Sequence, residues 1–246
     1  MINLEELQLY LLLRFNSTFV DGVQLFNGFL IYMIKLNKFT FSITTRVTNY
    51  VDTLSFATNE DIQRSFIGRY NQKVASYVKV NLEKRVGICH IYTIPYEFEY
   101  FYDLGNCLQG GMFHQVRYLR MDAKSDFEYE NFQLIAEQFP SLQLLFISIP
   151  NPMKDNQHSF TLIKFPYLKV LNLNGAHIQY VELFLMKNNT YLPCLFNLAM
   201  EYRSLIWITN NFTNDEKYFN FQKIEILNLG QSFVRPRHFH KYFPFL

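Results

Sequence analysis

Two pairs of neighbouring histidine and cysteine residues in this 246-residue chain have side chains that could act as a nucleophile, a base or a metal ligand. His238 and His240 are two residues apart, and on a strand they could offer two imidazole ligands to one metal ion. We expect a helix over 234–243, where residues i and i+2 point in different directions, so a metal site is not favoured. Cys89 and His90 could pair as nucleophile and base, but adjacent residues of a strand point to opposite faces. We therefore predict that Cys89 packs in the core and that the chain has no catalytic residue, metal or cofactor.

The common catalytic and phosphate-binding motifs do not occur in this sequence. It contains no G-x-G-x-x-G, P-loop, H-E-x-x-H or G-x-S-x-G pattern. Its 23 Lys and Arg nearly balance its 21 Asp and Glu, so the charge does not indicate a nucleic-acid partner. An enzyme would need a deep pocket with converging polar groups. We expect a protein that is not an enzyme and that does not bind nucleic acid.

The chain is expected in the cytoplasm or nucleus and not in a membrane. No run of residues reaches the roughly 18 apolar positions that a membrane-spanning helix needs. The apolar run Leu9–Leu13 is short and follows Glu5 and Glu6, where a signal peptide would carry positive charge. The three cysteines are far apart and odd in number, which fits free thiols in a reducing compartment.

A six-residue pattern, L-x-x-L-x-L, recurs along the chain and determines the fold prediction. The first apolar residues of five copies, at intervals of 26, 26, 27 and 29 residues, are Val116, Leu142, Leu168, Leu195 and Ile224. Most copies follow a Phe or Leu, often with Pro after it, as in "FPSLQL" and "FPYLKV". The interval lies in the range of 20–29 residues that is typical of leucine-rich repeats. Two upstream copies are Leu4-Leu7-Leu9 and Leu36-Phe39-Phe41.

The elements that carry this pattern can be predicted from its periodicity. The last two apolar residues of each copy alternate, so both lie on one face of a strand. The apolar spacing between copies favours helices at 127–138, 178–189 and 234–243. Each strand and helix leaves an apolar side that only a neighbouring unit can cover. The sequence therefore predicts an α/β fold, a degenerate leucine-rich-repeat solenoid with a parallel β-sheet on the concave side and helices outside. We expect a single solenoid over 1–246.

Residues 50–110 fit the repeat poorly, and they form either a distorted repeat pair or an insertion. Asn59 is expected to cap a short helix there, and "VASYVKV" and "GICHIYTIP" have the composition of strands. The repeats also lack the Asn or Cys that usually follows the last leucine. Those positions hold Lys124, Pro150, Ala176, Arg203 and Ser232, so the turns must be satisfied in another way.

Several segments resemble a known family when they are taken in order. "LEELQLY", "NEDIQRSFIGR", "QGGMFHQVRYL", "ITNNFTND" and "SFVRPRHFHKYFP" resemble the C-terminal repeat region of a lineage-expanded family of invertebrate F-box proteins. The resemblance implies that the repeat region holds the substrate of a cullin–RING ubiquitin ligase. The Leu-Pro and acidic residue that open an F-box are not visible in this sequence. A Skp-type adaptor is therefore expected as a partner only if an F-box is supplied elsewhere.

The candidate binding site is the concave face of the predicted sheet. Between the inward leucines, the outward positions of the strands are Tyr118, Arg120, Asp122, Phe146, Ser148, Asn172, Asn174, Asn197, Glu201 and Asn228. Aromatic, arginine and amide side chains suit protein recognition. We expect a protein-interaction scaffold that recognises substrate within an F-box-like ubiquitin-ligase receptor. The alternative is a truncated or structural fragment without a partner of its own.

Overall fold

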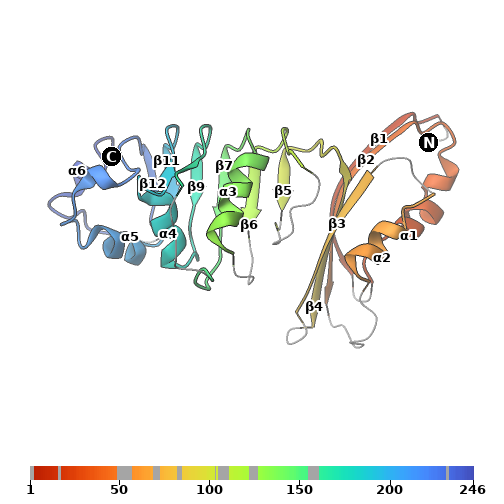
Figure 1. Ribbon diagram of the computed structural model, residues 1–246, viewed down its shortest axis with the longest axis horizontal. Helices are drawn as coiled ribbons and strands as arrows, with labels where there is room; N and C mark the ends of the chain where they lie inside the picture. Colours follow the sequence, from red (N-terminus) through yellow and green to blue (C-terminus); the bar gives the residue numbers. More distant parts are fainter. Residues whose placement is uncertain are drawn as a thin grey trace. The chain divides into compact units, whose positions relative to one another are not determined.

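The computed structural model shows a mixed α/β protein with parallel sheets and helices (Figure 1). The described residues are 3–15, 18–48, 57–68, 73–81, 85–102, 104, 111–121, 127–154, 161–230 and 233–246. The chain forms two compact units, Met1–Phe98 with Cys107–Gly111, and Glu99–Asn106 with Met112–Leu246. The single solenoid expected over 1–246 stays a prediction, and each unit is described by itself.

The first unit contains a four-stranded sheet of mixed direction. In spatial order its strands are β1 (Glu6–Phe15), β2 (Lys38–Thr48), β4 (Val86–Ile94) and β3 (Lys73–Asn81). The two upstream copies of the repeat pair in parallel, with Leu7 opposite Phe39 and Leu9 opposite Phe41. The two strand-like runs of 50–110 are β3 and β4, and β4 pairs antiparallel with both of its neighbours. These runs are therefore strands, as predicted, but they pair antiparallel and not in the parallel manner of the repeat.

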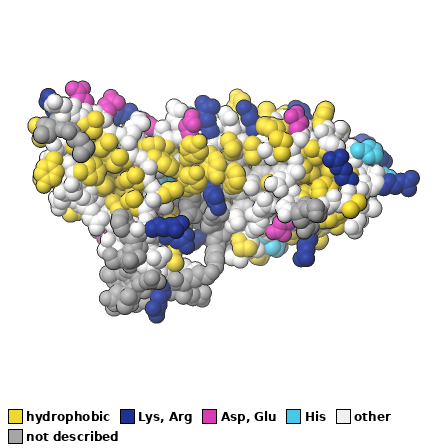
Figure 2. Space-filling model, turned by 180° about the vertical axis from the view of Figure 1, so that it is seen from behind, with side chains coloured by type: hydrophobic (Ala, Val, Ile, Leu, Met, Phe, Trp, Pro, Cys, Tyr) yellow, Lys and Arg dark blue, Asp and Glu magenta, His cyan; other side chains and the backbone are white. Residues whose placement is uncertain are grey.

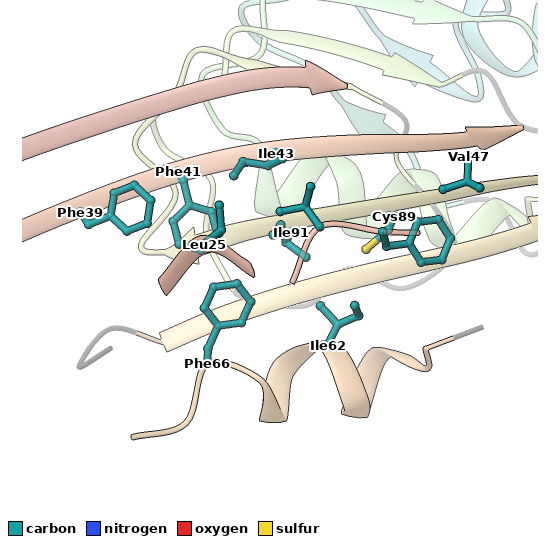
Figure 3. Close-up of a cluster of buried hydrophobic side chains, with 11 residues drawn as sticks. Leu25, Phe39, Phe41, Ile43, Val47, Ile62, Phe66, Cys89 and Ile91 are labelled. Atoms are coloured by element: carbon teal, nitrogen blue, oxygen red, sulfur yellow. The ribbon is translucent and has the colours of Figure 1, made fainter. Parts of the chain in front are cut away.

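One face of this sheet packs on two short helices, α1 (Gly22–Gly28) and α2 (Asn59–Arg64). Alternate residues of β2 point into this core, where Phe39, Phe41 and Ile43 are fully buried. Leu25, Ile62 and Phe66 cover them from the helical side (Figure 3). The period-2 alternation of a strand thus places every second side chain of β2 in one apolar cluster.

The cap of α2 differs from the prediction, because the N-cap residue is Thr58 and not Asn59. The Thr58 Oγ1 accepts a hydrogen bond from the Asp61 backbone N–H at 3.1 Å, and the Asp61 carboxylate accepts one from the Thr58 N–H at 3.0 Å. This reciprocal pair is a capping box. The carbonyl oxygen of Asn59 accepts a hydrogen bond from Ser76 Oγ at 3.1 Å, which ties the helix to β3.

The second unit contains a six-stranded parallel sheet whose strands lie side by side in chain order. They are β5 (Tyr100–Tyr102), β6 (Tyr118–Met121), β7 (Leu144–Ile147), β9 (Val170–Asn172), β11 (Asn197–Ala199) and β12 (Ile226–Asn228). All five strands predicted from the repeat are present in this one sheet. Their register aligns the central leucines, and Leu119, Leu145, Leu171 and Leu198 are fully buried.

A β-turn precedes each of the five repeat strands. In four of them the N–H of the first apolar residue of the repeat donates to the carbonyl of the Phe three residues earlier, at 3.2 Å for Val116, 3.1 Å for Leu142, 3.4 Å for Leu168 and 3.1 Å for Ile224. Leu195 makes the same bond to Leu192 at 3.4 Å. The side chain that begins each turn is buried. The F-P-x-L sequence is therefore a turn that fixes where the next strand begins.

Three helices lie in the connections between the strands of the second unit, α3 (Tyr129–Gln138), α4 (Ile178–Leu185) and α5 (Tyr202–Thr209), and α6 (Phe239–Tyr242) follows β12. Short 3-10 turns, η1 (Leu30–Tyr32) and η2 (Glu216–Tyr218), occur in the first and second units. The helices predicted at 127–138 and 178–189 are confirmed as α3 and α4. The one predicted at 234–243 is only the four-residue α6, and α5 was not predicted.

The helices α3 and α4 lie on one face of the sheet (Figure 1). Their apolar stripes meet, since the rings of Phe132 and Phe184 pack edge to face with centroids 5.5 Å apart. A separate pair of parallel strands, β8 (Ile163–Lys164) and β10 (Thr190–Tyr191), lies in the connections before β9 and β11. The other face of the six-stranded sheet carries the predicted binding residues.

Candidate protein-binding face

The two histidines considered as metal ligands lie at the start of α6. His238 is the N-cap residue of α6 and His240 lies inside that helix, and both are exposed. Within the described ranges, no three His, Cys, Asp or Glu side chains are close enough to hold a metal ion. In the same ranges, no helix is both long and apolar enough to cross a bilayer.

Cys89 and His90 point to opposite faces of β4, as predicted. Cys89 belongs to the apolar cluster under the helices, and burial raises the pKa of its thiol to about 12. A thiol with this pKa stays protonated at neutral pH and is a poor nucleophile. Cys89 is therefore a packing residue of the first unit.

His90 instead belongs to a buried polar cluster that the sequence did not reveal. Its Nε2 lies 2.9 Å from Ser42 Oγ, and that oxygen lies 3.1 Å from the Tyr96 hydroxyl. A serine beside a histidine could be a nucleophile and base pair, but all three side chains are at most 4 % exposed. Burial also lowers the pKa of His90 to about 3, so the imidazole is neutral. The cluster is closed to a substrate, and we interpret it as part of the core.

The side chains on the face of the six-stranded sheet opposite its buried leucines form two rows across the strands, which we call the open face. The first row, in register, is Tyr100, Tyr118, Leu144, Val170, Asn197 and Ile226. The second row is Tyr102, Arg120, Phe146, Asn172, Ala199 and Asn228. Along each strand, the residue between the two outward positions points to the opposite face. Both rows therefore lie on one face of the sheet, and the buried leucines lie on the other.

Aromatic side chains occupy one end of the open face. The Tyr118 ring lies 5.4 Å from the rings of Tyr100 and Tyr102, and 5.2 Å from that of Phe146, between centroids. Tyr100 is 47 % exposed, although it packs on its neighbours. We call these four residues the aromatic cluster. Aromatic pairs at these distances hold each other in place and leave a stable apolar surface.

Arg120 lies in the second row between Tyr102 and Phe146, and its side chain is exposed. A guanidinium beside aromatic rings can bind a carboxylate while its planar face stacks on a ring. The aromatic cluster with Arg120 thus combines the residue types that most often anchor protein interfaces.

At the amide end of the open face, two of the predicted residues also form hydrogen bonds within the chain. The Asn172 Oδ1 accepts a hydrogen bond from the Asn174 backbone N–H at 3.0 Å, and the Asn228 Oδ1 accepts one from the Gly230 N–H at 2.9 Å. These bonds close the turns after β9 and β12, in two of the repeats that lack the usual Asn or Cys. Each of the two amide oxygens therefore already accepts a hydrogen bond from within the chain.

The remaining predicted residues lie at the ends of the strands. Asn197 is half-buried in the first row, and Glu201 is the exposed N-cap residue of α5. Ser148 follows β7 and packs against Gly175, where an added Cβ would lie 2.9 Å from its Oγ. Asp122 lies outside the described residues.

Sequence reasoning missed Tyr100, Tyr102, Leu144, Val170 and Ile226 on the same face. Tyr100 and Tyr102 belong to β5, which has no copy of the repeat before it. The alternation in "YFY" was the available signal, since Phe101 is buried between the exposed Tyr100 and the half-buried Tyr102. Leu144, Val170 and Ile226 occupy variable positions of the pattern that strand alternation places outward.

The structure thus assembles Tyr118, Arg120, Phe146, Asn172, Asn197 and Asn228 on one face of one sheet. Comparison with known proteins adds no constraint, since no family model, no curated protein and no solved structure matches this chain.

Proposed function

We propose that this protein is a non-enzymatic interaction module whose open face binds an extended segment of a partner protein. The observation that carries the proposal is the aromatic cluster beside Arg120 on the exposed face of the parallel sheet. Protein interfaces are enriched in Tyr, Phe and Arg at their centres, where these side chains supply most of the binding energy.

The rows of the open face suit a segment that crosses the strands. Neighbouring strands lie about 4.8 Å apart, so a crossing segment meets a new side chain of each row at every strand. It would first contact the aromatic cluster and then the half-buried Val170 and Asn197. An apolar side chain of the partner would seat among the tyrosines, and a carboxylate would meet Arg120.

The leucine-rich-repeat arrangement belongs to the same proposal. It is supported by the chain order of the strands, by the interval of 26 to 29 residues and by the turn before each strand. On this basis the open face would recognise the substrate of an F-box-like ubiquitin-ligase receptor. The sequence resemblance described above supports that role. A Skp-type adaptor would then bind only with an F-box supplied elsewhere.

The test is affinity capture from native extract with a matched set of variants. Tyr118→Ala and Phe146→Ala remove two members of the aromatic cluster. Tyr167→Ala is the control, because Tyr167 is 58 % exposed and lies in a turn before β9. We expect one or a few proteins that the wild type and Tyr167→Ala capture equally and that the two cluster variants lose at least tenfold.

The outcomes separate the possible roles. Recovery of a Skp-type adaptor and a cullin together with the partner would support the ligase role. A partner without them would indicate an interaction module outside ubiquitination. If every captured protein is retained by the cluster variants, the open face is not the binding surface. Recovery of nothing but the chain itself and chaperones would favour the alternative, a structural fragment without a partner of its own.

A further inference from the structure

A second candidate surface lies on α5, away from the strand residues of the open face. Trp207, the single tryptophan of the chain, is 59 % exposed on this helix. It lines a shallow groove of about 530 Å³. The lining residues are Tyr202, Arg203, Ile206, Trp207, Asn210 and Asn211. We call it the Trp207 groove. Tryptophan is among the residue types that are enriched at the hot spots of protein interfaces.

The end of the groove is built by an unusual turn. Asn210, Asn211 and Phe212 all adopt the left-handed backbone region, with φ values of 49°, 55° and 61°. Single asparagines adopt this region readily, but three residues in succession that include a phenylalanine are rare. The turn is held from inside, since Thr209 Oγ1 donates to the Leu205 carbonyl at 2.8 Å and accepts from the Phe212 N–H at 3.2 Å. Asn210 and Asn211 are therefore fixed beside Trp207 with their side chains exposed.

The C-terminal segment continues this surface and makes it basic. The Phe233 ring lies 5.5 Å from the Tyr202 ring, so the segment that begins at Phe233 runs beside the groove. Residues 233–246 include Arg235, Arg237 and Lys241 and contain no Asp or Glu. Figure 2 shows Lys, Arg and His side chains gathered at this end of the molecule.

The charge on α5 agrees with this sign, since Arg203 is the one charged residue of the helix. Arg203 is exposed and forms no ion pair within the part of the chain that the structure describes. The acidic residues closest in sequence are Glu201 at the N-cap and the adjacent pair Asp215 and Glu216, of which Asp215 lies 3.7 Å from the Lys217 ammonium. The lining of the groove, with Arg203, and the C-terminal segment therefore favour a ligand of negative charge.

We propose that the Trp207 groove binds an acidic segment of a partner protein, with an apolar side chain of that segment seated on the indole. Arg203 would bind a carboxylate in a bidentate manner. The fixed amides of Asn210 and Asn211 would bond to the backbone of the segment. Because none of these residues lies on the open face, this second site does not depend on the first.

A random peptide library displayed on phage, panned against the full chain, tests the proposal without a known ligand. We expect the enriched peptides to carry a net negative charge and at least one Pro, aliphatic or aromatic residue. A labelled peptide from the selection should bind Trp207→Ala and Arg203→Glu at least tenfold more weakly than the wild type. Trp207 is exposed, so its replacement should leave the fold intact, and circular dichroism checks this.

Two controls distinguish binding in the Trp207 groove from binding to the open face and from non-specific binding. Tyr167→Ala and the open-face variant Tyr118→Ala should both bind the peptide with unchanged affinity. Raising the salt from 50 to 300 mM should weaken binding, because exposed charges are screened at high ionic strength. Peptide binding should also change the fluorescence of the wild type, whose single tryptophan lies in the groove.

Other results would overturn the proposal. It fails if no peptide is enriched, if the enriched peptides are neutral or basic, or if Trp207→Ala binds them as tightly as the wild type. Competition by a single-stranded dT12 oligonucleotide that binds the groove more tightly than the peptides would assign the surface to nucleic acid. Self-association of the wild type that Trp207→Ala abolishes in sedimentation would assign it to a second copy of the chain.

Discussion

Ser42 and His90 come from two antiparallel strands of the first unit and share a hydrogen bond of 2.9 Å between Oγ and Nε2. Both side chains are buried, and Tyr96 closes the cluster with its hydroxyl 3.1 Å from the same oxygen. The arrangement keeps a titratable ring inside the protein in its neutral form. The acid stability of the first unit therefore depends on His90.

Acid should destabilise the first unit through this histidine. The pKa of His90 is about 3 in the folded chain, against about 6.5 in the unfolded chain. Above pH 6.5 the ring is neutral in both states. Between pH 6.5 and 3 only the unfolded state binds the proton, so stability falls as the pH falls, by about 1.4 kcal/mol per pH unit. Hydrogen exchange of the β2 and β4 amides at pH 7 and pH 5 measures this loss.

The matched variants for this prediction are His90→Gln and His114→Gln. His114 is exposed and serves as the control. The loss of stability between pH 7 and pH 5 should shrink by about 2 kcal/mol in His90→Gln, because that proton is no longer bound by the unfolded state. An equal loss in both variants would show that other groups cause the acid sensitivity.

Truncation of an inward leucine should strongly destabilise the second unit. Leu145 is fully buried between the central strands, so Leu145→Ala leaves a cavity and should cost about 2–5 kcal/mol. Urea unfolding followed by Trp207 fluorescence reports this unit. Leu162→Ala is the control, since Leu162 is 42 % exposed and should change the free energy by less than about 0.5 kcal/mol. A cost below about 1 kcal/mol for Leu145→Ala would mean that the repeat leucines do not form a packed core.

Glycine should be required at position 175 for two separate reasons. Its φ is +77°, and an added Cβ would lie 2.9 Å from Ser148 Oγ. Gly175→Ala should therefore cost about 1–3 kcal/mol in urea unfolding. Gly230→Ala measures the free-energy cost of the positive φ alone, since its φ is +71° and no atom lies within 4 Å of the added Cβ. Adding Ser148→Ala to Gly175→Ala should recover part of the loss, and no recovery would argue against the close contact.

The left-handed turn after α5 should depend on the Thr209 hydroxyl. Thr209→Val keeps the shape of the side chain but leaves the buried Phe212 N–H without its acceptor. The expected cost is about 1–3 kcal/mol, measured by urea unfolding. Thr213→Val is the control, because the exposed Thr213 hydroxyl bonds only to the Asn210 carbonyl, at 2.5 Å. If both variants cost the same, the turn is held by its aromatic packing instead.

The sequence predicted the sheet of the second unit because its signal is repeated. One copy of L-x-x-L-x-L is compatible with many structures, but copies at near-constant intervals require equivalent positions, and the five predicted strands occupy them. The helices α3 and α4 were predictable because their apolar stripes have helical spacing. The helix α5 carries a comparable signal, since its buried Leu205, Ile208 and Thr209 have helical spacing, but it was not predicted.

The first unit contains features that the periodicity of the sequence does not predict. The strands β3 and β4 were visible as runs of β-branched and aromatic residues, but their direction depends on pairing with β2, which is a tertiary property. The cluster of Ser42, His90 and Tyr96 joins residues 48 and 54 positions apart in the sequence, so no local pattern could reveal it. The aromatic cluster was half predicted for a similar reason, because β5 contributes two of its four rings without a repeat of its own.

The turn that begins each repeat separates what must stay constant from what can vary. Its backbone bond and its buried first side chain fix the start of the next strand, whatever the length of the preceding connection. Insertions and deletions can therefore accumulate between strands, as the unequal intervals already show. The outward residues can change just as freely, because they do not contribute to the core. Such a scaffold can acquire new binding specificity by substitution along its rows, while the turns and buried residues that determine its fold remain the same.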